Sequence, residues 1–77
     1  MMKYKTINTL AIKEAIEIAG GANKLALKIQ ASYQTILNWK NARGSISPYN
    51  CLKIEQATDG KVKAKDILPD YPWDDLK

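Results

Sequence analysis

The sequence predicts an all-α fold, a small bundle of four to five helices that leaves room for one short extended segment near Val62. Two observations predict it. Apolar residues recur every three or four positions in successive stretches, which is the spacing of helices with one buried face. Residues that stop or start helices separate these stretches, above all Gly20-Gly21 and Ser47-Pro48. A length of 77 residues predicts one domain, which we expect over residues 1–69, followed by an acidic tail over residues 70–77.

The first predicted helix spans residues 7–19 and ends at Gly20-Gly21, because glycine is common just past a helix end. Thr6 or Asn8 is expected to cap its start, since a short polar side chain there accepts the first N–H groups. One face is predicted to be buried, and it comprises Ile7, Leu10, Ala11, Ala15, Ile18 and Ala19.

Two short helices are predicted next, over residues 23–29 and 33–40, with Ser32 as the N-cap of the second. Their buried positions are Leu25, Ala26, Ile29, Ile36 and Trp39. Residues 22–41 thus have the organisation of a helix-turn-helix. Only a small side chain fits where two helices cross steeply, so we expect Ala26 at the crossing with Ile36 packed against it.

The fourth predicted helix begins at Ser47-Pro48, because serine caps a helix and proline is tolerated in its first turn. It is expected to run to about Thr58 and to bury Cys51, Leu52, Ile54 and Ala57. Asp59-Gly60 reads as a turn, residues 61–63 as extended, and residues 65–68 as a single helical turn.

Composition indicates an intracellular globular chain. The one cysteine, Cys51, cannot form an intramolecular disulfide and is expected to be a small buried residue, which favours the cytoplasm. No apolar run approaches a membrane span, so no membrane partner is expected.

The charge is unevenly distributed. Residues 1–65 carry 11 Lys or Arg against 4 Asp or Glu, whereas residues 66–77 carry one Lys against four Asp. A basic body suits a polyanion such as nucleic acid, although lysine-rich solubility explains it equally well.

Catalysis is not expected. The chain has no histidine, which is the commonest general base and metal ligand, and it has no cysteine cluster or glycine-rich phosphate loop. We therefore assign no catalytic, metal-binding or cofactor-binding residue, and a chain this short leaves no room for a small-molecule sensing domain.

Residues 22–41 resemble the helix-turn-helix of the phage Cro and repressor family. The resemblance extends to Ile18-Ala19-Gly20-Gly21 before the motif, and after it to Ser47-Pro48 and to residues 66–70, as in Cro-like prophage regulators. It implies a lambda-repressor-like fold whose helix over residues 33–40 enters the major groove. Gln30 stands where the family often has glycine, at a turn position that favours positive φ.

The resemblance implies which residues contact DNA. Base contacts are assigned first to Gln34 and Asn38, whose amides match the donor and acceptor of adenine. The other base-contact candidates are Tyr33, Ser32, Thr35 and Leu37. Phosphate contacts are assigned to Asn23, Lys24, Lys40, Asn41 and Arg43. Solvated polar surface is the competing interpretation of each of these side chains.

Three further assignments remain open. Lys61, Lys63 and Lys65 suit either a phosphate-facing strip or a lysine-protected edge strand. Trp39 is expected to anchor the core, whereas Trp73 either folds back on the core or contacts a second subunit.

The implied function is repression of transcription by operator occupancy. A two-fold operator would require a homodimer on DNA, formed through the region after residue 44, from a chain that is monomeric when free. The alternative is a helix-turn-helix antitoxin or a protein-interaction module. RNA binding is disfavoured, since no aromatic platform for unpaired bases is evident.

Overall fold

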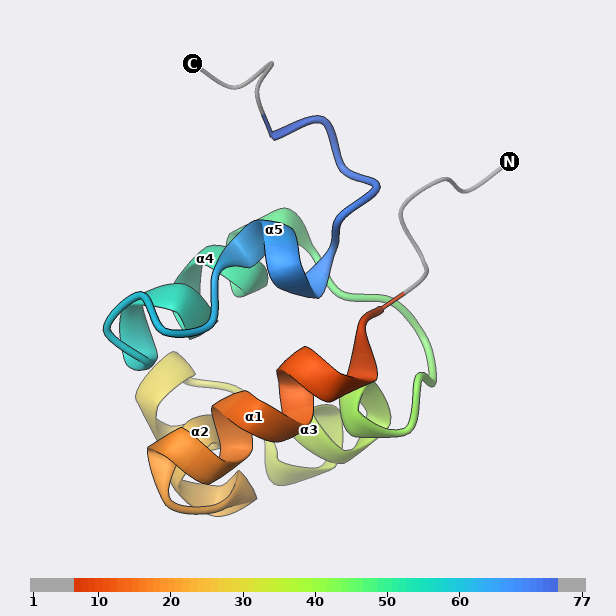
Figure 1. Cartoon of the computed structure of the whole chain (residues 1–77). Coiled ribbons are helices and arrows are strands. Elements are labelled where there is room, and N and C mark those ends of the chain that lie inside the picture. Colours follow the sequence, from red (N-terminus) through yellow and green to blue (C-terminus); the bar gives the residue numbers. More distant parts are fainter. Residues whose placement is uncertain (1–6, 74–77) are drawn as a thin grey trace.

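Five helices make up the fold of residues 7–73, the range that the computed structural model describes (Figure 1). They are α1 (Thr9–Ala19), α2 (Ala22–Ile29), α3 (Tyr33–Lys40), α4 (Pro48–Ala57) and α5 (Ala64–Ile67). No strand occurs in this range, so the all-α prediction is confirmed. Near Val62 the chain only bends, and Lys63 has an extended conformation as it enters α5 (φ −88°, ψ 152°).

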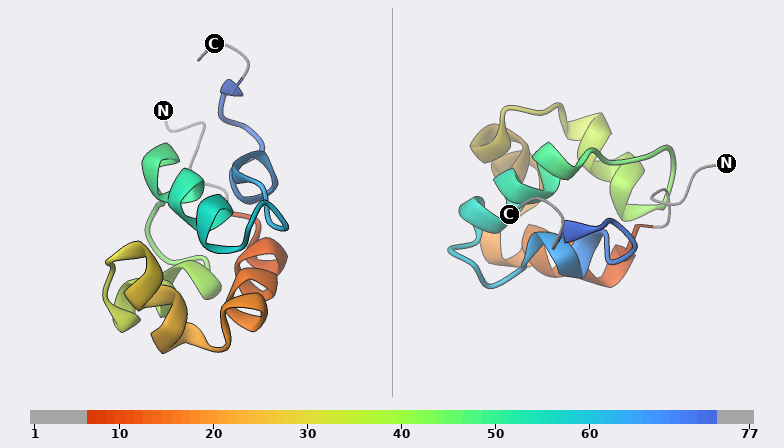
Figure 2. Two further views of the ribbon diagram at one scale, coloured as in Figure 1. Left: turned by 90° about the vertical axis from the view of Figure 1, so that its left-hand side faces the viewer. Right: turned by 90° about the horizontal axis from the view of Figure 1, so that it is seen from above.

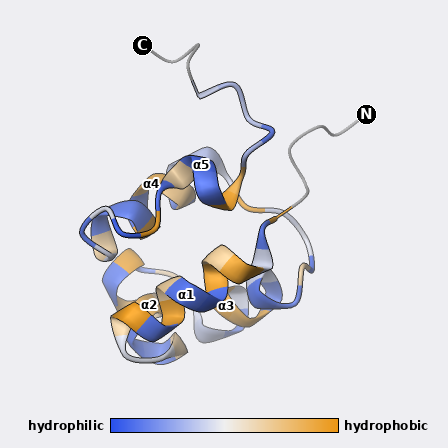
Figure 3. Cartoon of the chain, viewed as in Figure 1, coloured by the Kyte–Doolittle hydropathy of each residue, from blue (hydrophilic) through white to orange (hydrophobic). Residues whose placement is uncertain are grey.

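The helices form two layers. In two perpendicular views, α1, α2 and α3 lie together below, while α4 and α5 cover them from above (Figures 1 and 2). Helix α2 packs against α1, α3 and α4, and α1 also contacts α3 and α5. The fully buried side chains between the layers include Ile12, Leu25, Ile29, Ile36, Ile54, Ile67 and Leu68. Figure 3 shows apolar stretches alternating with hydrophilic ones along the helices.

Helix α1 ends as predicted but begins at Thr9, two residues later than predicted. Four predicted residues are buried (Ile7, Ala11, Ala15 and Ala19), but the buried face also includes Ile12 and excludes Leu10. Asn8 is the cap, since its Oδ1 accepts from the N–H groups of Leu10 and Ala11, and Gly20 adopts the left-handed conformation (φ 95°). Thr6, the other candidate cap, lies outside the described residues. The buried set is Ala11, Ile12, Ala15 and Ala19. Leu10 is 73% exposed, so its predicted burial is wrong.

The reason is the rotation of α1 about its axis. At about 100° per residue, the middle of the buried set lies near Ala15 and Ala19, which places Leu10 on the opposite side of the helix. Small alanines at the centre let α1 approach its neighbours closely. Ile18 lies at the margin of this face and is 39% exposed.

Helix α4 shows the same kind of difference. Ser47 accepts from the N–H of Asn50 as the predicted N-cap, and Cys51 and Ile54 are buried. Leu52 is 45% exposed, so its predicted burial is wrong. Thr58 takes a place in the core instead and is 1% exposed. At its C-terminal end, α4 therefore buries the side chain of its capping residue, Thr58, rather than that of Leu52.

The segment after α4 is held by hydrogen bonds. The N–H of Ala64 donates to Glu55 Oε1 at 2.8 Å, and Asn8 joins both ends of the fold by donating from its backbone N to Ile67 O at 2.9 Å and from Nδ2 to Asp66 O at 3.0 Å. Trp73 packs against the core and donates from Nε1 to Leu68 O at 2.8 Å. Trp73 thus folds back on the core, which is one of its two predicted placements. Residues 74–77, the rest of the predicted tail, lie outside the described range.

No helix within residues 7–73 is both long enough and apolar enough to cross a membrane.

Candidate nucleic-acid interface

The turn between α2 and α3 has the predicted strained residue. Gln30 adopts the left-handed conformation (φ 59°, ψ 42°) that glycine tolerates best. Its N–H is directed at the carbonyls of Ala26 and Leu27, and the N–H of Ala31 donates to Ala26 O at 2.9 Å. These bonds close the end of α2, so the chain turns within three residues and α3 begins at Tyr33.

The two helices are anchored by their inner sides. Ala26 is 5% exposed and Ile36 is fully buried, as predicted, and both belong to the hydrophobic core. Helices α2 and α3 are in contact. Trp39 is 3% exposed and donates from Nε1 to Ser45 O at 3.2 Å, so its assignment as a core anchor is confirmed. The opposite side of α3 is therefore held outward.

Two hydroxyls are joined at the start of α3. Ser32 Oγ accepts from the N–H of Thr35 at 3.1 Å and lies 2.8 Å from Thr35 Oγ1. Ser32 is thus the N-cap that the sequence predicts, and its hydroxyl is engaged in starting the helix. This occupation makes Ser32 the least available of the predicted base-contact side chains.

The outer side of α3 presents two amides in contact. Gln34 is exposed and Asn38 is half-buried, and Gln34 Nε2 donates to Asn38 Oδ1 at 3.1 Å. Their side chains lie outside the hydrophobic core. Tyr33 is 48% exposed beside them, and Leu37 is half-buried on the same side of the helix.

The predicted phosphate-contact residues are all exposed and flank α3 in sequence. Asn23 and Lys24 lie in the first turn of α2, Lys40 is the last residue of α3, and Asn41 and Arg43 come directly after that helix. Gly21, the N-cap of α2, provides no side-chain hydrogen bond. The first N–H groups of α2 are thus left for water or an anion.

Lys13 was not among the predicted site residues. A hollow between α1 and α3 is lined by Lys13, Ile16, Glu17 and Lys40, so the fold places a second lysine near the end of α3. The two lysines are separated by 27 positions in sequence, and no local pattern indicates that they share a surface.

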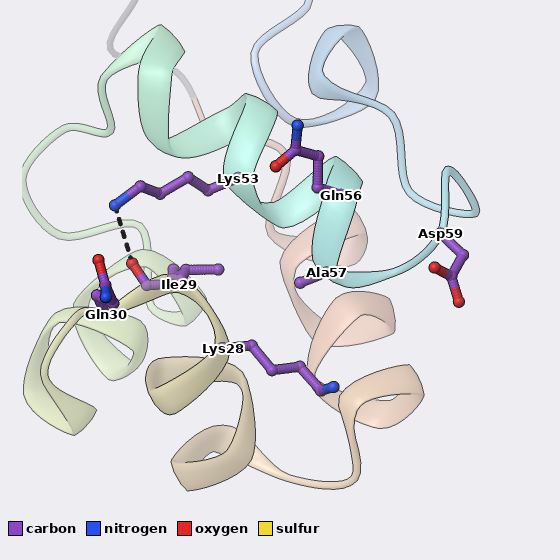
Figure 4. Close-up of a pocket in the computed structure, with 7 residues that line it drawn as sticks. All are labelled: Lys28, Ile29, Gln30, Lys53, Gln56, Ala57 and Asp59. Atoms are coloured by element: carbon purple, nitrogen blue, oxygen red, sulfur yellow. Dashed lines mark hydrogen bonds between the residues drawn. The ribbon is translucent and has the colours of Figure 1, made fainter.

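A second hollow lies between the end of α2 and α4 (Figure 4). Lys53 crosses it and donates from Nζ to Ile29 O at 3.1 Å, and its ammonium also lies 4.7 Å from the centre of the Tyr49 ring. A cation on the last carbonyls of a helix is stabilising. Lys53 therefore links α4 to the end of α2, where the turn toward α3 begins.

Lys61, Lys63 and Lys65 are exposed on the bend after α4 and on α5. The edge-strand interpretation of these lysines is wrong, because residues 61–65 form a bend followed by a helix.

Two known proteins are similar in sequence to most of this chain. The chain is 29% identical over 68 residues to the "Regulatory protein cro" of Pseudomonas phage D3. The matched region covers 88% of this chain and 93% of that protein. It is 27% identical over 67 residues to the "Putative transcriptional regulator YdaS" of Escherichia coli (strain K12), covering 87% and 68% respectively. No solved structure matches the chain significantly.

These relatives confirm the resemblance to Cro-like prophage regulators. The family described as "Bacterial toxin YdaS" matches residues 12–76, which is most of the chain. The chain belongs to this family.

Proposed function

We propose that this protein is a cytoplasmic transcriptional regulator that binds double-stranded DNA sequence-specifically and represses by occupying an operator. The observation that carries the proposal is the outer side of α3, where Gln34 and Asn38 are held away from the core by the buried Ile36 and Trp39. The names of the two relatives, a Cro protein and a putative transcriptional regulator, support it. We propose no enzymatic activity.

The proposed contacts divide into two kinds. Gln34 and Asn38 read base edges in the major groove, with Tyr33, Thr35 and Leu37 contributing apolar or hydroxyl contacts and Ser32 mainly capping the helix. The phosphate contacts are Asn23, Lys24, Lys40, Asn41 and Arg43, to which the fold adds Lys13. These groups orient the protein on the duplex without selecting sequence.

The proposed complex is a homodimer on a two-fold operator, with half-sites about 34–36 Å apart, or one helical turn. The partner surface would lie after α3. Tyr49 and Leu52 support this placement, because they are 67% and 45% exposed on α4 although they are large and apolar.

The testing experiment is selection of bound sequences from a random duplex pool, followed by a salt titration on the selected site. Arg43→Ala should weaken binding to every sequence and reduce the slope of log K against log salt by about 0.9. Lys65→Ala removes another exposed charge, on α5, and tests the strip of Lys61, Lys63 and Lys65: a reduced slope would show that the strip also contacts phosphate, and an unchanged slope would show that it does not. Failure of the wild-type protein to select or shift any duplex would rule out the proposed function.

The family description favours a second candidate, inhibition of bacterial growth. Expression in Escherichia coli of the wild type and of Gln34→Ala/Asn38→Ala separates two routes to that effect. Inhibition that acts through DNA would be lost in the variant. Inhibition that persists in a folded variant would indicate a protein target.

A further inference from the structure

We infer that Gln34 and Asn38 read DNA as one hydrogen-bonded unit, which selects an adenine next to a base with an exocyclic oxygen, either guanine or thymine. The inference rests on the proposed function and specifies the target of the same surface of α3. Its basis is the 3.1 Å hydrogen bond from Gln34 Nε2 to Asn38 Oδ1.

The spacing of the two amides indicates adjacent base pairs. Residues four apart rise about 6 Å along a helix, which is nearly two base steps of about 3.4 Å each. The hydrogen bond draws the two amides together, since Gln34 Nε2 lies 3.1 Å from Asn38 Oδ1, so the groups that they present lie closer than the rise of the helix alone would place them. Acting together, the two side chains therefore face neighbouring pairs.

The hydrogen bond also assigns different roles to the two amides. Gln34 keeps its carbonyl oxygen and one N–H, and these complement the N6 donor and N7 acceptor of adenine. Gln34 occupies one of the two lone pairs of Asn38 Oδ1, so the groups of Asn38 that are wholly free for DNA are its two N–H donors. Donors require acceptors, of which guanine presents two (O6 and N7) and thymine presents one (O4). Cytosine presents only an amino group and would be rejected, and adenine, whose N7 acceptor lies beside an amino group, would be disfavoured.

The two hydroxyls at the start of α3 are engaged with each other. The hydroxyls of Ser32 and Thr35 are bonded to each other at 2.8 Å at the start of α3. Partial burial of Asn38 further restricts the directions that its amide can take. The pair is thus oriented before DNA arrives, which lowers the entropy lost on binding.

The test is sequence selection from a random duplex pool with the full chain and two variants. Asn38→Asp keeps an acceptor for Gln34 but loses both donors, so the adenine preference should remain while the neighbouring preference changes from guanine or thymine to cytosine or adenine. Gln34→Ala should lose the adenine preference and also broaden the neighbouring one, because Asn38 loses the group that orients it. Each variant should bind the wild-type site at least about tenfold more weakly.

Lys65→Ala, distant in sequence from α3, should keep both preferences, and circular dichroism should show that all the variants are folded. If the wild type selects no sequence, the proposed function fails and the inference fails with it. If the wild type is selective but Gln34→Ala leaves the neighbouring preference unchanged, the amides act independently and only the inference is overturned. Should Asn38→Asp not fold, Gln34→Ala decides alone.

Discussion

Thr58 is the buried polar side chain on which the junction between α4 and α5 depends. Its Oγ1 accepts from the N–H of Val62 at 3.1 Å and donates to Ile54 O at 3.0 Å, and the residue is 1% exposed. Thr58→Val keeps the shape and the β-branch of the side chain but removes both its hydrogen-bond donor and its hydrogen-bond acceptor. The carbonyl of Ile54 still accepts from the N–H of residue 58, whereas Val62 N–H is left without its acceptor.

A buried donor that loses its partner costs about 1–3 kcal/mol. A domain of this size has a free energy of unfolding of about 4–12 kcal/mol, from roughly 0.05–0.15 kcal/mol per residue. A loss of about 2 kcal/mol would lower Tm by about 8–16 °C, since each kcal/mol corresponds to about 4–8 °C at this length. We expect Thr58→Val to be folded but clearly less stable.

Thermal and urea unfolding measure the loss, and amide hydrogen exchange locates it at Val62, whose N–H should exchange faster. Thr58→Ser is the matched control, because it keeps both hydrogen bonds and loses one methyl group, worth about 0.8 kcal/mol. If Thr58→Val is as stable as Thr58→Ser and the N–H of Val62 stays protected, the argument from this hydrogen bond is wrong.

Three further predictions concern stability and reactivity. Gln30→Gly should raise the free energy of unfolding by about 0.5–1 kcal/mol, because relief of left-handed strain exceeds the added entropy of the unfolded chain. Lys28→Gly, inside α2, should lower it by about 1 kcal/mol. If urea unfolding shows that both variants change the free energy of unfolding in the same direction, this reasoning is wrong. Lys53→Met should cost about 1 kcal/mol, since it removes the hydrogen bond to Ile29 O, and an unchanged urea midpoint would show that this bond contributes nothing. Burial raises the pKa of Cys51 to about 12, so the native thiol stays protonated while the unfolded thiol ionises near its ordinary value of 9.0. Stability should therefore fall as pH rises above about 9, and alkylation of Cys51 at pH 8 should proceed only at the rate of unfolding; rapid labelling of the native protein would contradict its burial.

The helix ends could be predicted from the sequence because their signals are local. Asn8, Gly20 and Ser47 each act on backbone groups within a few residues, and each occupies the cap that its chemistry favours. The buried face of α1 could not be predicted in the same way. Large apolar residues occur nearly all around this helix, and the packing of α3 and α5 against it decides that Ile12 is buried and Leu10 is exposed.

The same distinction applies to the candidate interface, where some features follow from local sequence and others from tertiary packing. Spacing alone predicted that Ile36 and Trp39 point inward, which leaves Gln34 and Asn38 outside. The hydrogen bond between the two amides depends on their rotamers, which sequence does not reveal. The lysine pair of Lys13 and Lys40 depends on how α1 lies against α3, and this is a property of the assembled core.

The two hydrogen bonds from Asn8 to residues 66 and 67 connect the beginning of the described fold to its last helix. Ile67 and Leu68 are fully buried, so a growing polypeptide cannot complete its core until these late residues have left the ribosome. A fragment that stops short of them would contain every proposed DNA-contact residue and still lack the scaffold that holds α3 in place. The amount of active protein in a cell should therefore depend on full-length synthesis, and prematurely terminated products should be degraded rather than compete for the proposed operator.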